Sequence, residues 1–421
     1  MRISHAHDVD TRAVPVRASA RVVLLIALAL AAIGTVVGLI VLWPSEDPRP
    51  DGPETAFAAP GVTFEKATVE LVQPVCERPE SGGAGGEPSP PDQEPAPRCG
   101  EVEVTVLAGA SKGERVSVSV APEVTSSGLE RGDVLEIMRI PPSEEGAPPS
   151  YGFFSVNRDV PLGILAGIFV LAVALVARVR GILALLGLGF GGYVVVKFML
   201  PALLGGESGL SVAVVSASAI MFVVLYLAHG VSMRTSAALA GTLTGVAITA
   251  LIGLVAIDRT RLSGISDDTG ALLSTFVPDM DFQGLLTCAV IVAGLGLLND
   301  VTITQASSVW ELRGAGPELS PPQLYRRAMR IGRDHIASTI YTIVFAYAGT
   351  ALSVLLLLYF YERPLLSLVS TQQIAEEIMM TLASGIGLVL AVPITTAIAA
   401  LTVGAARPAG SGSPAGQGGS P

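Results

Sequence analysis

The sequence has few charged side chains, few cysteines and few histidines. What it lacks excludes several classes of protein. Only 15% of the 421 residues are charged whereas 50% are hydrophobic, which is more apolar surface than one soluble core can bury. No long basic run and no stripe of interleaved basic and aromatic residues occurs, which excludes a nucleic-acid surface. The four histidines form no zinc-ligand spacing, and no nucleophile stands beside a base. We therefore predict no metal site, no cofactor and no catalytic residues.

Long apolar runs are what the sequence does contain. The hydrocarbon core of a bilayer is about 30 Å thick, and a helix that crosses it needs roughly 17–25 mostly apolar residues. Eight such runs predict eight transmembrane helices, at residues 22–43, 161–177, 181–200, 210–229, 236–257, 283–304, 336–360 and 376–403. The chain is thus predicted to be a polytopic α-helical membrane protein in a lipid bilayer, with a seven-helix domain over 161–403. The first run exceeds the ~7–15 apolar residues of a signal peptide, so it is interpreted as an uncleaved span.

Between the first two runs the composition changes to proline, glycine, glutamate and short alternating segments. Five segments with period-two or β-branched character predict strands at residues 62–72, 101–107, 115–120, 133–140 and 153–156. We predict a small β-rich domain, either a barrel or a sandwich, over residues 44–160. Within it, the low-complexity segment 79–98 is predicted to be a disordered loop.

Two cysteines flank that loop. If the first span runs from inside to outside, Cys76 and Cys99 lie in an oxidising compartment, where a disulfide would close the loop at its base. The alternative is two unpaired thiols. Cys288 lies in an apolar run and is interpreted as a small apolar filler.

The distribution of arginine predicts the orientation of the chain in the membrane, because short cytoplasmic connections are enriched in Lys and Arg. The connection before the 336–360 run is the most basic one, with Arg313, Arg326, Arg327, Arg330 and Arg333. The alternate connections carry mostly aspartate and glutamate. We therefore predict a plasma-membrane protein with an extracytoplasmic β-rich domain. Both termini are predicted to be cytoplasmic, as residues 1–21 and a disordered tail, 404–421.

The segment 294–311 is the main candidate for chemistry. On a helix, Asp300 and Glu311 fall on one polar stripe whose members recur every three or four residues. Placing a carboxylate inside the membrane costs free energy unless the group is paired, protonated or hydrated. Asp300 is therefore a candidate for ion or proton coupling. The predicted coupling site comprises Asp300, Asn299, Thr302, Thr304 and Gln305. The alternative is that the span ends near Leu298 and the rest is a solvated cytoplasmic helix.

A second group of polar residues stands where the 336–360 run begins. These residues could pair with Asp300, and the predicted polar partners of the site are Glu311, Arg333, Asp334 and His335. The alternative for the arginine is an anchor at the inner membrane face, and for the histidine an interfacial residue rather than a proton relay.

Three segments carry a family resemblance: GLLNDVTITQASSVWELR at 296–313, IGRDHIASTIYTIVFAYAGT at 331–350 and EEIMMTLASGIGLVLAVPITTA at 376–397. They resemble the YibE/F family of bacterial membrane proteins, over roughly residues 150–403. The resemblance implies a multi-pass plasma-membrane protein with an extracytoplasmic region after its first span, and it brings no established biochemical activity. A fainter similarity to resistance-nodulation-division and SecDF transporters, which use intramembrane acids for proton coupling, also nominates Asp300.

Two functions are carried forward. The first is a transporter or translocation component that moves an unknown solute or ion and uses Asp300 for coupling. The second is a non-transporting scaffold or sensor whose outer domain binds a ligand or an envelope protein and whose helices only anchor it. An envelope protein or a second copy of the chain is the predicted protein partner. An intramembrane enzyme is a third and less favoured class.

Overall fold

A computed structural model describes residues 14–44, 61–73, 100–142, 148–360, 367 and 369–404. The chain forms two compact units, one of residues 1–49 with 173–421 and one of residues 50–172. Cys76, Cys99 and the predicted loop 79–98 lie outside the described residues, as do most of the two predicted cytoplasmic ends.

The smaller unit contains a five-stranded antiparallel sheet with the order β3-β2-β1-β4-β5. The strands coincide with the five predicted segments: β1 is Thr63–Val72, β2 Glu101–Val106, β3 Arg115–Ser119, β4 Val134–Ile140 and β5 Ser150–Val156. Alternate residues such as Val69, Val104 and Leu135 are fully buried, because successive side chains of a strand point to opposite faces. Their buried faces form one apolar core within this unit.

The two edge strands of this sheet curl toward each other. β3 and β5 are in contact although they share no ladder, and the Tyr151 hydroxyl of β5 donates to Ser111 Oγ over 2.6 Å. Before β4 the chain turns at Gly132, whose φ of 98° belongs to the left-handed region that glycine adopts without strain. The short helix α2 (Pro122–Thr125) lies between β3 and β4. The sheet is therefore closer to a small barrel than to an open layer.

The rest of the described chain is helical. Its long helices are α1 (Ala18–Val41), α3 (Asp159–Val194), α5 (Gly209–His229), α6 (Met233–Thr260), α8 (Phe282–Ala315), α9 (Pro321–Thr350) and α12 (Gln372–Thr402). The shorter ones are the π-helical η1 (Val195–Met199), α4 (Leu200–Leu204), α7 (Asp268–Phe276) and α10 (Leu352–Phe360). Side chains cap several of them: Ser232, Asp267 and Asp281 each accept a hydrogen bond from a backbone N–H of the first turn.

Six helices of the described chain are long and apolar enough to cross a membrane, and α9 with α10 makes a seventh if this pair, bent by 66°, is one span. The predicted runs 161–177 and 181–200 both lie in the stretch Asp159–Leu204, which is two helices joined at a kink between the two runs. Arg178 interrupts this stretch with non-helical φ and ψ angles of 53° and −137°. The multi-pass helical architecture is thus confirmed, whereas the number of eight spans remains a prediction.

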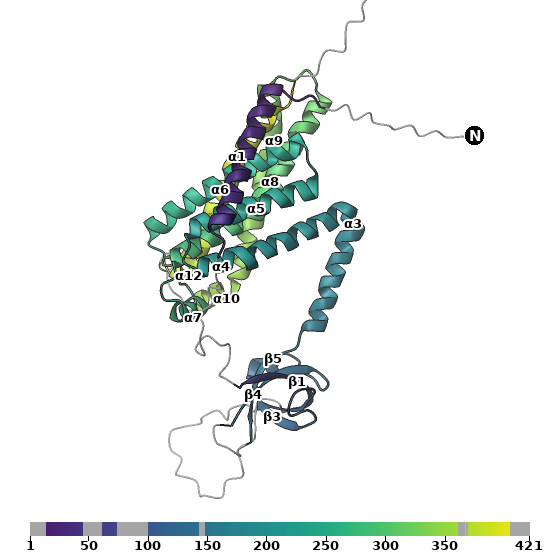
Figure 1. Cartoon of the computed structure of the whole chain (residues 1–421), viewed down its shortest axis with the longest axis vertical. Coiled ribbons are helices and arrows are strands. Elements are labelled where there is room, and N and C mark those ends of the chain that lie inside the picture. The colour runs from purple at the N-terminus through teal and green to yellow at the C-terminus, as the bar shows by residue number, and fades with distance from the viewer. Residues whose placement is uncertain are drawn as a thin grey trace, which may run out of the picture. The chain divides into compact units, whose positions relative to one another are not determined.

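Three helices form the centre of the larger unit. α6, α8 and α12 each make their most extensive contacts with the other two, while α5 packs on α6 and α8, and α9 on α8 and α12 (Figure 1). On α8 the buried residues Leu298, Val301, Gln305 and Val309 recur every three or four positions, which is the spacing of one helix face. This centre positions the predicted site.

The two ends of the larger unit meet. Val16 forms an isolated antiparallel bridge with Val403, and the backbone N–H of Arg17 donates to the Thr402 carbonyl over 3.0 Å. The first residues of α1 and the last residues of α12 therefore lie at the same end of the helical unit.

Candidate functional site

The predicted coupling residues occupy two different faces of α8. Thr302 and Gln305 are buried against α6, α9 and α12, whereas the side chain of Asp300 is 70% exposed. The reason is the 100° turn per residue of an α-helix, which cannot place Asp300 and Thr302 on the same side. Asn299 and Thr304 are half-buried at the borders of these two faces.

Asp300 lies beside His335 of α9. The distance between His335 Nε2 and Asp300 Oδ2 is 3.8 Å, and the His335 side chain is 30% exposed. The same His335 Nε2 atom is buried without a hydrogen-bond partner, as is Oδ1 of Asn299, the residue before Asp300 in the sequence. An imidazole beside a carboxylate is a combination of side chains that general acid–base chemistry uses. Of the predicted polar partners, His335 is the one that the fold brings to Asp300.

Three buried hydrogen bonds lie on the inner face of α8. The hydroxyl oxygens of Thr242 on α6 and Thr302 are 2.6 Å apart. The Gln305 amide nitrogen donates to Thr396 Oγ1 of α12 over 2.7 Å and to the Ala328 carbonyl of α9 over 3.0 Å. These contacts join four helices through side chains that are almost completely buried.

A second group of polar side chains lies further along α6, α8 and α12. The Thr249 side chain of α6 is fully buried and its Oγ1 has no hydrogen-bond partner. It lies against Gly387 of α12, where even one added methyl group would collide with the threonine hydroxyl. Ser384, one turn earlier on α12, donates to the Val290 carbonyl of α8 over 3.5 Å. The small residues of α12 thus let α6 approach closely at a polar position.

Two glutamates near the start of α12 were not among the predicted site residues. Glu376 is 5% exposed and accepts a hydrogen bond from Gln372, while Glu377 Oε2 is buried without a partner. Tyr347 of α9 lies near Glu377 and Ser384. The sequence signal that could have identified them is two consecutive acids at the head of an apolar run, where a charge is costly.

The other predicted partners form no ion pair with Asp300 or His335. Glu311, Arg333 and Asp334 are exposed, and none of them forms an ion pair with another residue of the described ranges. In those same ranges, no group of three or more His, Cys, Asp or Glu side chains is arranged to hold a metal ion. Within the described chain, the polar chemistry at the predicted site therefore comes from the Asp300–His335 pair and the buried hydroxyl and amide groups.

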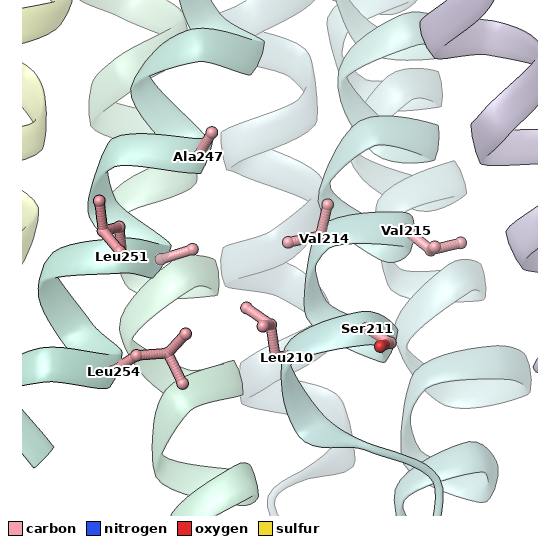
Figure 2. Close-up of a pocket in the computed structure, with 8 residues that line it drawn as sticks. Leu210, Ser211, Val214, Val215, Ala247, Leu251 and Leu254 are labelled. Atoms are coloured by element: carbon pink, nitrogen blue, oxygen red, sulfur yellow. The ribbon is translucent and has the colours of Figure 1, made fainter. Parts of the chain in front are cut away.

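A groove of 490 Å³ between α5 and α6 has a different character. Its lining is aliphatic except for one hydroxyl: Leu210, Ser211, Val214, Val215, Ala247, Ala250, Leu251 and Leu254. Figure 2 shows the side chains of α5 and α6 on either side of it. Such a lining suits an acyl chain rather than a polar or charged solute.

The family model described as YibE/F-like protein matches residues 165–405, a stretch that contains α5, α6, α8, α9 and α12. No curated protein and no solved structure matches the chain.

Proposed function

This chain belongs to the YibE/F-like family, and we propose that it is a membrane transporter that couples the movement of a solute or ion to proton transfer at the Asp300–His335 pair. The observation that carries this proposal is the pair itself, a carboxylate and an imidazole 3.8 Å apart on neighbouring helices. An unpaired carboxylate on a membrane helix is costly, and a histidine is the side chain whose charge changes near neutral pH.

The depth of Asp300 supports this role. Asp300 follows Phe282, the first residue of α8, by about 18 residues, which corresponds to about 27 Å of helix. A hydrocarbon core of about 30 Å that begins near Phe282 would therefore end close to Asp300. At such a boundary the carboxylate can exchange protons with water while the imidazole remains partly shielded.

The buried polar residues extend from this boundary toward the other one. Ser384 of α12 reaches Val290 of α8, and Thr396 reaches Gln305, so the two helices run parallel. Glu376 and Glu377 consequently lie toward the Phe282 end of the unit. About 20 residues, or about 30 Å of helix, separate Glu376 from Thr396. Buried hydroxyl, amide and carboxyl groups thus mark a line across the helical centre, along which a proton or small cation would move when the helices separate.

The proposed orientation places both termini and the Asp300 pair on the cytoplasmic side of the plasma membrane, with eight spans and the sheet outside. The bridge between Val16 and Val403 supports the placement of both termini on the same side of the membrane. The arginine-rich connection supports the assignment of that side as cytoplasmic. Single cysteines introduced at Val14 and at Ser117 of the sheet, in a background with the native cysteines replaced by serine, test this proposal. An impermeant maleimide applied to intact cells should label only the position in the sheet, and labelling of Val14 would reverse the orientation.

The decisive experiment compares variants in a deletion strain. Ion and metabolite contents are measured after rescue with the native protein, Asp300→Asn or His335→Gln at matched membrane levels. Asp334→Asn and Glu311→Gln are the controls, because both acids are exposed and form no ion pair in the described chain. We expect one solute to change on deletion and to be restored by the native protein and the controls, but not by the Asp300 or His335 variants.

The opposite outcomes are equally informative. Full rescue by both Asp300→Asn and His335→Gln would refute coupling through the pair. If those variants rescue while removal of residues 61–156 abolishes rescue, the protein is a scaffold or sensor that acts through its sheet. A solute identified by the first screen is then tested in liposomes that contain the purified protein, where an imposed pH gradient should drive its uptake.

A further inference from the structure

A second groove, separate from the proposed coupling site, runs along α1. It has a volume of 590 Å³ and is lined by α1, α6 and α12: Arg17, Ser19, Ala20, Val23, Leu24, Ala27, Ala240, Thr244, Ile398, Leu401 and Thr402. Its polar members Arg17, Ser19 and Thr402 lie at the end where α1 begins and α12 finishes. The lining beyond them is mainly aliphatic, so the groove has one charged end and one apolar end.

The charged end has an excess of positive charge. The Arg17 side chain forms no ion pair within the described chain, and it lies near enough to Arg313 for the two charges to repel each other. The Arg313 side chain is 2% exposed and donates to the carbonyls of Pro317 and Leu319, but its Nε and Nη2 atoms are buried without a partner. Within the described chain, the Glu318 carboxylate attracts Arg313 there. A ligand that brings a negative charge to this end would relieve the repulsion.

The length of the groove matches one leaflet of a bilayer. About ten residues of α1 separate Arg17 from Ala27, which corresponds to about 15 Å of helix and to half of the roughly 30 Å hydrocarbon core. Arg17 stands one turn before the apolar run of α1, at the level where headgroups lie. Arginine binds phosphate oxygens through a planar fork of N–H donors.

We propose that this groove binds an anionic phospholipid of the leaflet on the side of the termini. The Arg17 guanidinium binds the headgroup phosphate, and one acyl chain lies between α1, α6 and α12. The bound lipid fastens α1 to the central helices, since α1 otherwise touches α6 and α12 over limited stretches. The inference is independent of the proposed transport function.

The test uses the full-length protein purified in a mild detergent. Native mass spectrometry and lipid extraction measure binding after addition of phosphatidylglycerol or phosphatidylcholine. Three variants are compared with the native protein: Arg17→Gln removes the headgroup contact, Ala240→Leu fills the groove and keeps the arginine, and Arg21→Gln is the control. Arg21 is exposed one turn further along α1 and does not line the groove. Size-exclusion profiles identify any variant that has not folded.

We expect the native protein and Arg21→Gln to retain one phosphatidylglycerol, and Arg17→Gln and Ala240→Leu to bind it at least tenfold more weakly. Phosphatidylcholine should bind the native protein much less. Equal retention by Arg17→Gln and Arg21→Gln would overturn the proposal. Loss of lipid binding in Arg17→Gln but not in a folded Ala240→Leu would overturn the proposal that an acyl chain lies in the groove. Displacement of the lipid by millimolar inorganic phosphate would assign the site to free phosphate instead. If Ala240→Leu does not fold, Ala27→Leu makes the same comparison from the α1 wall.

Discussion

Gln305 and Thr396 join α8 to α12 by a hydrogen bond of 2.7 Å in a region from which the surrounding helices exclude solvent. The same amide nitrogen also donates to the Ala328 carbonyl of α9 over 3.0 Å. One side chain thus holds three helices, and Gly332 of α9 leaves the space that it occupies, since a methyl group there would press on the Gln305 amide. The Asp300–His335 pair is a second side-chain contact between α8 and α9.

Replacing Gln305 with leucine should loosen this junction. The variant loses both hydrogen bonds, while the Thr396 hydroxyl still donates to its own helix at the Val392 carbonyl. Because the Thr396 hydroxyl is then not left without a partner, we expect a loss of only about 1–2 kcal/mol of stability. The measurement is thermal unfolding of the purified protein in detergent, with Glu311→Gln as the exposed control on the same helix. An unchanged melting temperature would show that the amide does not hold the helices together.

The close approach of α6 and α12 should make Gly387 intolerant of alanine. A methyl group at Gly387 would collide with the Thr249 hydroxyl, whereas at Gly385 no atom lies within 4 Å of the added carbon. We expect Gly387→Ala to lower the yield of folded protein and its melting temperature, and Gly385→Ala to resemble the native protein.

Thr249 offers an internal rescue of that variant. Its Oγ1 has no hydrogen-bond partner, so Thr249→Ala removes the collision with the hydroxyl without breaking a bond, although the Thr249 Cβ stays 3.1 Å from the added carbon. The double variant Gly387→Ala with Thr249→Ala should therefore be more stable than Gly387→Ala alone, as followed by fluorescence-detected size-exclusion after heating. A double variant as unstable as the single one would locate the effect elsewhere.

The Asp300–His335 pair should matter for activity far more than for stability. Because Asp300 is 70% exposed, the pair contributes at most about 1 kcal/mol to folding. We expect Asp300→Asn, His335→Gln and the double variant to unfold within a few degrees of the native protein. All three should lose the same fraction of transport, since either single change removes the function of the pair. Additive losses of transport in the double variant would indicate two independent roles.

Truncating a buried side chain of the sheet should make the sheet unfold while the helices stay folded. Leu135 is fully buried between the faces of the sheet, so Leu135→Ala should cost about 2–5 kcal/mol in this unit. Limited proteolysis of the full-length protein should then cleave within residues 61–156 and leave a protected helical fragment. Leu71→Ala is the matched control, because Leu71 is exposed on β1 and its truncation leaves no cavity.

The alternation of residues and the length of the apolar runs predicted most of the fold. Val102, Val104 and Val106 alternate with polar residues, and this pattern has one stable arrangement, a strand with one buried face. The apolar runs likewise predict membrane helices, because each such run needs an apolar environment along its whole length. The break at Arg178 falls between the runs predicted at 161–177 and 181–200, where Arg178 and Arg180 interrupt the apolar sequence.

The sequence predicted the segment that contains the candidate site. It did not predict which side chains of that segment are buried and which are exposed. Asp300, Thr302 and Gln305 stand within six residues, and their polarity in a membrane run marked all three. Which of them faces outward depends on how α8 rotates against α6, α9 and α12, and that rotation is fixed by packing at residues distant in sequence. Glu376 and Glu377 were missed for the same reason, since their burial comes from neighbouring helices.

The sequence by itself determined that this chain is a multi-pass helical protein with a small antiparallel sheet, because hydrophobic length and periodicity are local properties. Only the tertiary structure decided that Asp300 pairs with His335, that Gln305 joins three helices, and that a groove with Arg17 at one end lies along α1. Each of these relationships joins residues on different helices, and the close packing of those helices, rather than any local preference, sets the distances between them.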